Sequence, residues 1–333
     1  MTPESISQEE RHVLERDYEE HLLDADNRYE LKRQDKEFGR TQDSTKIVMV
    51  DLQKCLPTPL LNNAQSFYTL KLWTLNYTVY DATEKSASCF MWDESIAGRG
   101  GNEKASCIFR YILSLSDLVQ HVIIWSDNCP SQNRNQQMIM CYLLILTLKP
   151  SIKCIEHKYL LRGHTHMEVD SIHSRIERTT RNFPAFSVAT PWDWQQLVRL
   201  CGPKINTIEM DTTDFKNFNL HNNSKSFFQA NKKTTNGQNF LISKVVHLKF
   251  LTEEPGNLYF KTNFGQTQFD QVDFSRPSRR TSLRGTEGSL LTLIPICDTL
   301  KPISTKKYKD LQKLLLWVPK DFTNSIKIYL MQI

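Results

Sequence analysis

Seventeen residues at positions 161–177, LRGHTHMEVDSIHSRIE, concentrate side chains that can bind a metal or transfer a proton. They include three histidines, two glutamates and one aspartate. Imidazole nitrogens favour zinc and other transition metals, whereas carboxylate oxygens favour harder ions such as Mg²⁺. The segment therefore predicts a metal site, and acidic residues elsewhere in the chain decide which metal fits it.

Two aspartates stand where the strands of an open α/β sheet place ligand groups. Asp51 follows the apolar stretch KIVMV, and Asp127 follows VIIWS. If these two strands are neighbours, both carboxylates meet at one edge of the sheet. Two close carboxylates repel each other unless they share a proton or bind a hard cation such as Mg²⁺. The simpler alternative is that each aspartate caps the loop or helix that follows it.

A third acidic residue belongs to a helix that we predict from about residue 167 to residue 180. Offsets of three and seven from Asp170 reach His173 and Glu177, so the three side chains can share one helix face. We expect this face to point at the two strand ends. Two strand-end aspartates and a helical acid are the arrangement of ribonuclease H-like nucleases, which hold two Mg²⁺ ions for phosphodiester chemistry.

The elements that must position these residues follow from the hydrophobic pattern. Residues 46–202 predict the order β-β-β-α-β-α-β-α, an α/β fold with a mixed, ribonuclease H-like sheet in which parallel strands join a meander of three. Residues 8–37 alternate in charge and lack Gly and Pro, which predicts a solvated helix within an N-terminal extension of residues 1–45. Residues 203–333 predict a small β-rich part that ends in a helix.

The composition excludes several classes of protein. Of the 333 residues, 39% are hydrophobic and 24% are charged, which is ordinary for a globular chain. The charged N-terminus and the absence of any apolar run near the ~18 residues that span a bilayer predict an intracellular protein without a membrane partner. The eight cysteines form no CxxC pair, so we expect reduced thiols. The net charge of +5 is unevenly placed, and the basic part over residues 201–333 is compatible with a nucleic-acid partner.

Five segments follow one another along residues 46–200: VDLQKCLPTPLL, YTLKLWTLNYTVYDA, FMWDESIAGRGGNEKASCIFRYI, IIWSDNCPSQNRN and HKYLLRGHTHMEVDSIHSRIER. Together they resemble a family of transposon-encoded and transposon-derived eukaryotic proteins with a ribonuclease H-like transposase core. The resemblance implies a triad of Asp51, Asp127 and Asp170 that binds two Mg²⁺ or Mn²⁺ ions, with DNA as the partner and the nucleus as the location. Family members often carry an upstream cysteine- and histidine-rich region, which is absent here, so we expect no DNA-reading module of that kind.

We therefore expect a transposase-like nuclease or strand transferase, either monomeric or homo-oligomeric, that cuts DNA by a two-metal mechanism. The alternative is a catalytically inactive, domesticated transposase that binds nucleic acid or protein. A third hypothesis is a zinc hydrolase, because His164 and His166 have the spacing of an HxHxDH motif. Glu168 and Val169 stand where that motif needs Asp and His, which disfavours zinc chemistry.

Two further groups of residues receive supporting roles. The residues expected to orient a metal ligand or to replace Asp170 are His164, His173, Glu177 and Asn128. The residues expected to contact the DNA backbone are Arg134, Arg162, Arg279 and Arg280. The glycine-rich turn WDESIAGRGGNE lacks Walker spacing and its Lys-Ser/Thr pair, so no nucleotide cofactor is expected.

Overall fold

A computed structural model describes residues 8–61, 64–182, 188–219, 228–275 and 293–318, together with residues 323 and 327. These residues contain seven α-helices and ten strands, so the predicted α/β class is confirmed. The elements are, in chain order, α1 (Gln8–Thr41), β1 (Thr45–Leu52), β2 (Leu56–Thr58), α2 (Ala64–Tyr68), β3 (Leu72–Asp81), β4 (Ser86–Asp93), α3 (Gly101–Ser114), β5 (His121–Ser126), α4 (Gln136–Leu148), β6 (Cys154–Tyr159), α5 (Glu168–Asn182), α6 (Pro191–Arg199), β7 (Ile205–Glu209), the short 3-10 helix η2 (Ile242–Lys244), β8 (His247–Leu251), β9 (Asn257–Lys261), β10 (Asp270–Asp273), α7 (Thr305–Leu314) and the 3-10 helix η3 (Leu315–Trp317).

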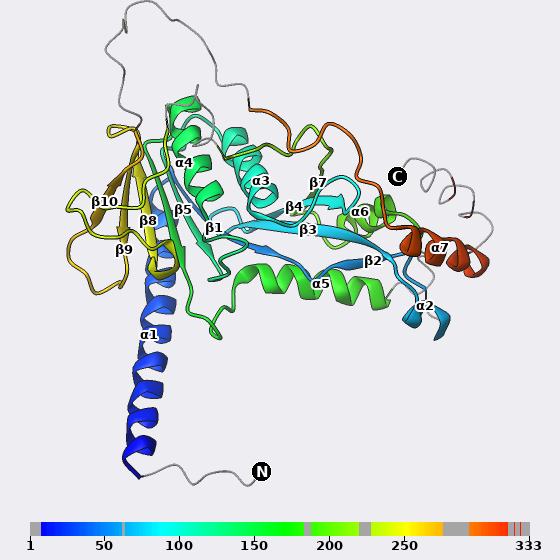
Figure 1. Ribbon diagram of the computed structural model, residues 1–333, viewed down its shortest axis with the longest axis horizontal. Coiled ribbons are helices and arrows are strands. Elements are labelled where there is room, and N and C mark those ends of the chain that lie inside the picture. The colour runs from blue at the N-terminus through cyan, green and yellow to red at the C-terminus, as the bar shows by residue number, and fades with distance from the viewer. Residues whose placement is uncertain are drawn as a thin grey trace, which may run out of the picture.

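All ten strands belong to one mixed, mostly antiparallel sheet (Figure 1). Nine of them follow the order β10-β9-β8-β6-β5-β1-β3-β4-β7, and β2 pairs with β3. β1 pairs antiparallel with β3, which pairs antiparallel with β4. On its other side β1 is parallel to β5, which is parallel to β6. The helices α3 and α4 connect these parallel strands, as a parallel pairing requires.

The alternation of side chains along β1 divides the core into two layers. Val48 and Val50 are fully buried with residues of α3 and α4 on one face of the sheet. Ile47 and Met49 are fully buried on the other face, beside residues of α1 and α5. Figure 1 shows α3 and α4 on the upper side of the sheet and α5 on the lower side. A strand covered on both faces needs apolar residues at successive positions, which explains the continuous stretch KIVMV.

The strands of residues 203–333 form no sheet of their own within the described residues. β8 pairs antiparallel with β6, and β9 and β10 follow it at that edge. β7 pairs parallel with β4 at the opposite edge. The sheet is therefore continuous across the boundary that the sequence predicts after residue 202.

The helix predicted over residues 8–37 is observed as α1, which extends beyond the sheet at its N-terminal end (Figure 1). Its second half is less solvated than predicted. Arg28 is buried, and its Nη1 donates a hydrogen bond to the carbonyl oxygen of Tyr159 at 3.1 Å. Asp35 accepts a bond of 2.8 Å from Trp125 Nε1 and pairs with Lys158 at 2.8 Å. The C-terminal half of α1 is thus part of the core.

A buried histidine connects β6 to α4 and β5. His157 is completely buried, with Nδ1 2.9 Å from Tyr142 Oη and Nε2 2.8 Å from Ser126 Oγ. The ring of Tyr159 lies 4.4 Å away, centroid to centroid. Burial, together with the nearby His247, lowers the pKa of His157 to about 3. The imidazole is therefore neutral in the folded protein at ordinary pH.

None of the helices in the described ranges combines the length and the apolar character needed to cross a bilayer.

Candidate metal centre

The parallel pairing of β1 with β5 makes Asp51 and Asp127 neighbours. Their register pairs Val50 with Ser126, so the next position on each chain is an aspartate. Asp51 continues the side-chain alternation of the face that α1 and α5 cover, because it follows Met49 by two residues, and Asp127 comes directly after the last residue of β5. The predicted meeting of these carboxylates at the carboxyl ends of two strands is supported by this register.

The helix α5 brings two further ligand groups to this edge. Asp170 lies in its first turn, and His173 lies one turn further along the helix. One ligand atom from each of Asp51, Asp170 and His173 lies within 4.8 Å of the others. The observed cluster therefore contains two of the three predicted aspartates together with a histidine that was predicted only as a supporting group. Asp127 lies beside the cluster and is not one of its members.

Asp51 is a partly buried carboxylate that lies near two other acidic side chains. Burial, the nearby charge of Asp127 and, to a smaller extent, the charge of Asp170 together raise its pKa to about 7. A hydrogen bond from the main chain of Leu52 and the charge of Lys104 act in the opposite direction. A divalent cation would remove this repulsion, so the arrangement favours metal binding at neutral pH.

Asp127 is held by the loop that follows β5. Its Oδ1 accepts a hydrogen bond of 2.6 Å from Asn133 Nδ2 and a longer one of 3.4 Å from the main-chain N–H of Cys129. Asn133 is fully buried, and its Oδ1 in turn lies 3.4 Å from Tyr77 Oη. Within the described part of the chain these bonds use only one carboxylate oxygen.

Asp170 and His173 are fixed by neighbours that were not predicted. Asp170 Oδ2 accepts a bond of 2.7 Å from the main-chain N–H of Met167 and lies 3.1 Å from His166 Nδ1. His173 Nε2 lies 3.1 Å from Thr78 Oγ1, on the strand beside Asp51. Burial lowers the pKa of His173 to about 4, although Asp170 opposes this shift. A neutral imidazole is the form that binds a metal.

Lys104 is a buried cation that the sequence interpretation overlooked. It is completely buried on α3, where its Nζ donates to the carbonyl oxygens of Arg99 and of Gly100, the second at 3.5 Å. Burial lowers the pKa of its ammonium group. The sequence indicates this burial only through the neighbours of Lys104 in NEKASCIFRYI, which include alanine, cysteine and isoleucine. A helix face that is exposed to solvent would seldom be so apolar.

The four residues with predicted supporting roles separate into two pairs. His173 joins the cluster, and Asn128 next to Asp127 has a buried Oδ1 for which the described residues offer no hydrogen-bond partner. His164 instead lies against His21 of α1, with ring centroids 5.2 Å apart. Glu177 is exposed and belongs to no group of ligand atoms in the described residues.

The predicted DNA-contacting arginines require one correction. Arg134 is buried, and its Nη1 donates to the carbonyl oxygen of Val245 at 3.1 Å, so its guanidinium packs inside the protein and does not face a ligand. Arg162 is exposed, as the prediction requires. Arg279 and Arg280 lie outside the described residues.

Comparison with known proteins gives the family but no activity. Residues 73–253, more than half of the chain, match the model of a domain of unknown function, DUF7869, so the protein belongs to this family. The matched segment runs from β3 to just past the end of β8, and it contains Asp127, Asp170 and His173 but not Asp51. No curated protein and no solved structure matches the chain.

Proposed function

We propose that the protein is a transposase-like nuclease or strand transferase that cleaves DNA phosphodiester bonds with the help of two Mg²⁺ or Mn²⁺ ions. The observation that carries this proposal is the cluster of Asp51, Asp170 and His173 within 4.8 Å, with Asp127 at the next strand end. Carboxylates converging from two adjacent strands and one helix are the ligand set of two-metal phosphoryl-transfer sites. The proposed partner is DNA, and the proposed location is the nucleus.

The topology supports a ribonuclease H-like core. The strand order β4-β3-β1-β5-β6 places three antiparallel strands beside two that are parallel to β1. Along the chain these strands alternate with α3, α4 and α5 in the order that the sequence predicts, apart from the inserted β2 and α2. The candidate ligands occupy β1, the end of β5 and the start of α5, which are the positions expected for such a core.

The donor atoms decide which ions fit. Carboxylate oxygens suit Mg²⁺ and Mn²⁺, and the imidazole of His173 shifts the preference toward Mn²⁺. The buried Oδ1 of Asn128, which has no hydrogen-bond partner among the described residues, is a further oxygen beside Asp127. Asp51 interacts electrostatically with both Asp127 and Asp170, so it is the residue suited to be shared between two ions.

The chain's own residues then have separate tasks. Asp127 would complete the site on one side of Asp51, and Asp170 with His173 would complete it on the other. Ions held there would activate the attacking oxygen and stabilise the leaving oxygen of the phosphodiester. Asn133 and Met167 keep the outer aspartates in place through the hydrogen bonds described above. Such positioning is what lets a metal site act without reorganising.

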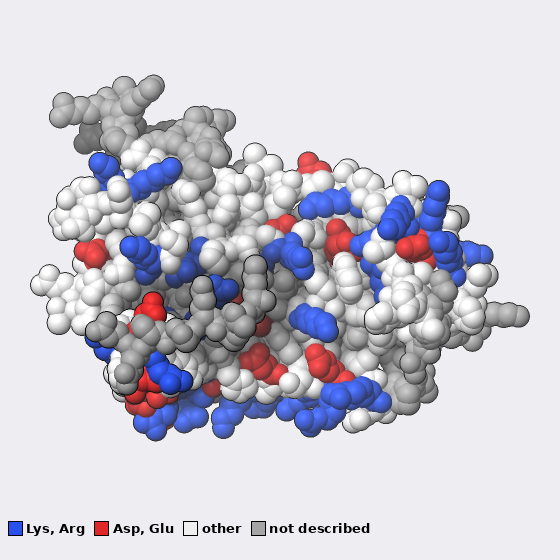
Figure 2. Space-filling model, turned by 60° about the horizontal axis from the view of Figure 1, so that its bottom comes forward, with Lys and Arg blue, Asp and Glu red and all other residues white. Residues whose placement is uncertain are grey.

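The surface around α5 suits a phosphate backbone. Arg175 and Arg178 are exposed on the same helix as Asp170, and Arg162 is exposed in the loop before it. Figure 2 shows the side of the molecule on which α5 lies, with Lys and Arg side chains gathered along its lower edge and right end around more central acidic groups. Basic side chains around an acidic centre attract the phosphates of DNA without forming ion pairs with the metal ligands.

The test is cleavage of duplex DNA by the purified protein in the presence of Mg²⁺ or Mn²⁺. We expect nicking by the wild type, and a loss of about 100-fold or more in Asp51→Asn and Asp127→Asn. Glu177→Gln is the matched control, because it removes an exposed carboxylate of α5 outside the cluster. Equal activity of Asp127→Asn and the wild type would refute the role of Asp127.

The domesticated, non-catalytic alternative makes a different prediction for the same proteins. It expects the wild type to bind duplex DNA in a gel-shift assay without cutting it under any metal condition. Binding without cleavage would therefore overturn the nuclease proposal in favour of this alternative. The zinc hydrolase receives no support, because His164 and His166 belong to no group of ligand atoms among the described residues.

A further inference from the structure

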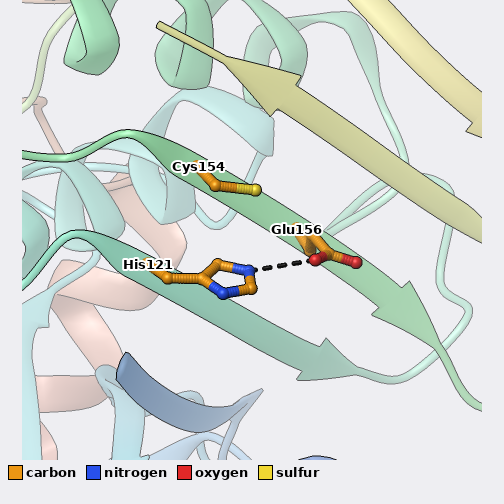
Figure 3. A group of neighbouring side chains, drawn as sticks. All are labelled: His121, Cys154 and Glu156. Carbon is orange, nitrogen blue, oxygen red and sulfur yellow. Dashed lines mark hydrogen bonds and ion pairs between the residues drawn. The ribbon is translucent and has the colours of Figure 1, made fainter. Parts of the chain in front are cut away.

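A second group of metal-binding side chains lies at the opposite end of β5 from Asp127. His121 is the first residue of β5, and the register of the parallel pair places it beside Cys154, the first residue of β6. Glu156 follows two residues later and points to the same face. One ligand atom from each of the three lies within 4.8 Å of the others. Figure 3 shows the imidazole and the carboxylate facing each other, with the sulfur beside them.

The chemistry of these three groups differs from that of the Asp51 cluster. They offer one imidazole nitrogen, one sulfur and one carboxylate oxygen, which is a set that zinc accepts and Mg²⁺ does not. In a tetrahedral zinc site with bonds of about 2.0 to 2.3 Å, neighbouring ligand atoms lie about 3.3 to 3.8 Å apart. His121 Nε2 and Glu156 Oε1 are 2.9 Å apart. Small side-chain shifts would therefore admit the ion in place of the shared proton.

The surroundings hold the carboxylate in the orientation that a ligand needs. Glu156 Oε2, the oxygen not bonded to His121, lies 2.5 Å from His247 Nε2 of β8. Ligating carboxylates are commonly hydrogen-bonded at the second oxygen in this way. Lys158 Nζ lies 3.8 Å from the same oxygen, but it also pairs with Asp35 at 2.8 Å, so its charge is already balanced.

The degree of burial suits a small ion. The side chains of His121 and Glu156 are 22% and 12% exposed, so the group is shielded yet still reachable from solvent. Phe38 of α1 covers one side of the His121 ring, with centroids 6.3 Å apart. A neutral imidazole, a thiolate and a carboxylate carry two negative charges, which one Zn²⁺ ion neutralises. Burial raises the pKa of the Cys154 thiol to about 12, so the ion must displace a proton to bind the sulfur.

We propose that His121, Cys154 and Glu156 form a Zn²⁺ site, with a water molecule as the fourth ligand and His247 as the residue that orients Glu156. The site links β5 to β6 beneath the end of α1. It shares no ligand with the cluster of Asp51, Asp170 and His173, and the length of β5, about 20 Å, separates His121 from Asp127. Its presence or absence is therefore independent of the proposed nuclease activity.

The test uses Co²⁺, which replaces zinc and gives an intense near-ultraviolet absorption only when a thiolate is among its ligands. We expect this absorption on adding Co²⁺ to the wild-type protein, and its disappearance on adding excess Zn²⁺. Cys154→Ser should remove the absorption. Cys129→Ser is the matched control, because Cys129 is another partly exposed thiol that lies next to the Asp127 loop. Asp51→Asn should also keep the absorption.

Two further measurements separate the zinc site from a metal-free hydrogen-bond cluster. His247→Gln should weaken Zn²⁺ binding about 10- to 100-fold while the sulfur absorption with saturating Co²⁺ remains. Zn²⁺ should raise the melting temperature of the wild type but not that of Cys154→Ser, whose circular dichroism checks its fold. Absence of the sulfur absorption in the wild type, or its loss in Cys129→Ser and not in Cys154→Ser, would overturn the proposal.

Discussion

The charge of Asp51 should destabilise the metal-free protein. Moving the pKa of Asp51 from 3.8 to about 7 corresponds to about 4 kcal/mol, at about 1.4 kcal/mol for each pH unit. Below pH 3.8 the carboxyl is protonated in both the folded and the unfolded protein, and nothing is lost. Between pH 3.8 and about 7 the unfolded chain ionises first, so stability falls as the pH rises, and the whole loss is present above pH 7.

Asp51→Asn removes this charge and keeps the shape of the side chain. At pH 8 with a chelator present, we expect the variant to be more stable than the wild type by about 2 to 4 kcal/mol. The gain falls below the full value where the new amide does not find hydrogen-bond partners. At pH 4 the two proteins should have nearly equal free energies of unfolding. Urea unfolding followed by circular dichroism measures both values. Glu177→Gln, which changes an exposed carboxylate, should stay within about 0.5 kcal/mol of the wild type.

Metal should narrow or cancel the difference in stability between the wild type and Asp51→Asn. With Mn²⁺ at about 100 times its dissociation constant, the wild type should gain about 2.7 kcal/mol, whereas Asp51→Asn should gain much less. The reasoning would be refuted by a variant that is less stable than the wild type at pH 8 without metal. It would equally be refuted if Mn²⁺ stabilised both proteins by the same amount.

Three other substitutions test the packing around the candidate site. The pKa of His157 is lowered in the folded protein, so below pH 6.5 the unfolded state binds the proton first and the wild type loses up to about 1.4 kcal/mol of stability for each pH unit. His157→Gln should remove this loss. Urea unfolding of both proteins at pH 7 and pH 5, with a chelator present, measures the difference. Arg28→Met, which breaks the bond to Tyr159, should cost about 1 to 3 kcal/mol in urea unfolding and increase hydrogen exchange in α1. Gly39→Ala should lower the melting temperature, because a Cβ there would lie 2.4 Å from Cγ1 of the fully buried Ile47, and this clash outweighs the better helix propensity of alanine.

The sequence located the acidic residues because local patterns were sufficient to place them. An aspartate after an apolar stretch marks a strand end, and this holds for Asp51 and Asp127. Helical spacing correctly put Asp170 and His173 on one face. It could not choose between His173 and Glu177, which point in nearly the same direction. Seven residues advance a helix by about 10 Å, so Glu177 lies beyond the strand ends that Asp170 reaches.

Features that depend on long-range pairing were missed. The short helix α2, which contains Phe67 and Tyr68, is absent from the predicted element order, because a brief aromatic stretch fits a helix and a strand equally well. The role of Arg134 was misjudged for a similar reason. Its position after Asp127 suggested a ligand contact, but the partner that buries it is the main chain of Val245, more than 100 residues away. Nothing in the local sequence specifies that contact.

The two candidate metal centres depend on the same structural feature, the register of β5. Its residues on one face are His121, Ile123 and Trp125, with the apolar pair buried and Trp125 bonded to Asp35 of α1, and Asp127 follows directly after the strand ends at Ser126. Because side chains alternate along a strand, a shift of one residue would move His121 to the opposite face and away from its partners on β6, and it would displace Asp127 along β1. The buried pair in the middle prevents that shift. The core packing of β5 therefore fixes the position of ligands at both of its ends, although the two ligand sets favour different metals.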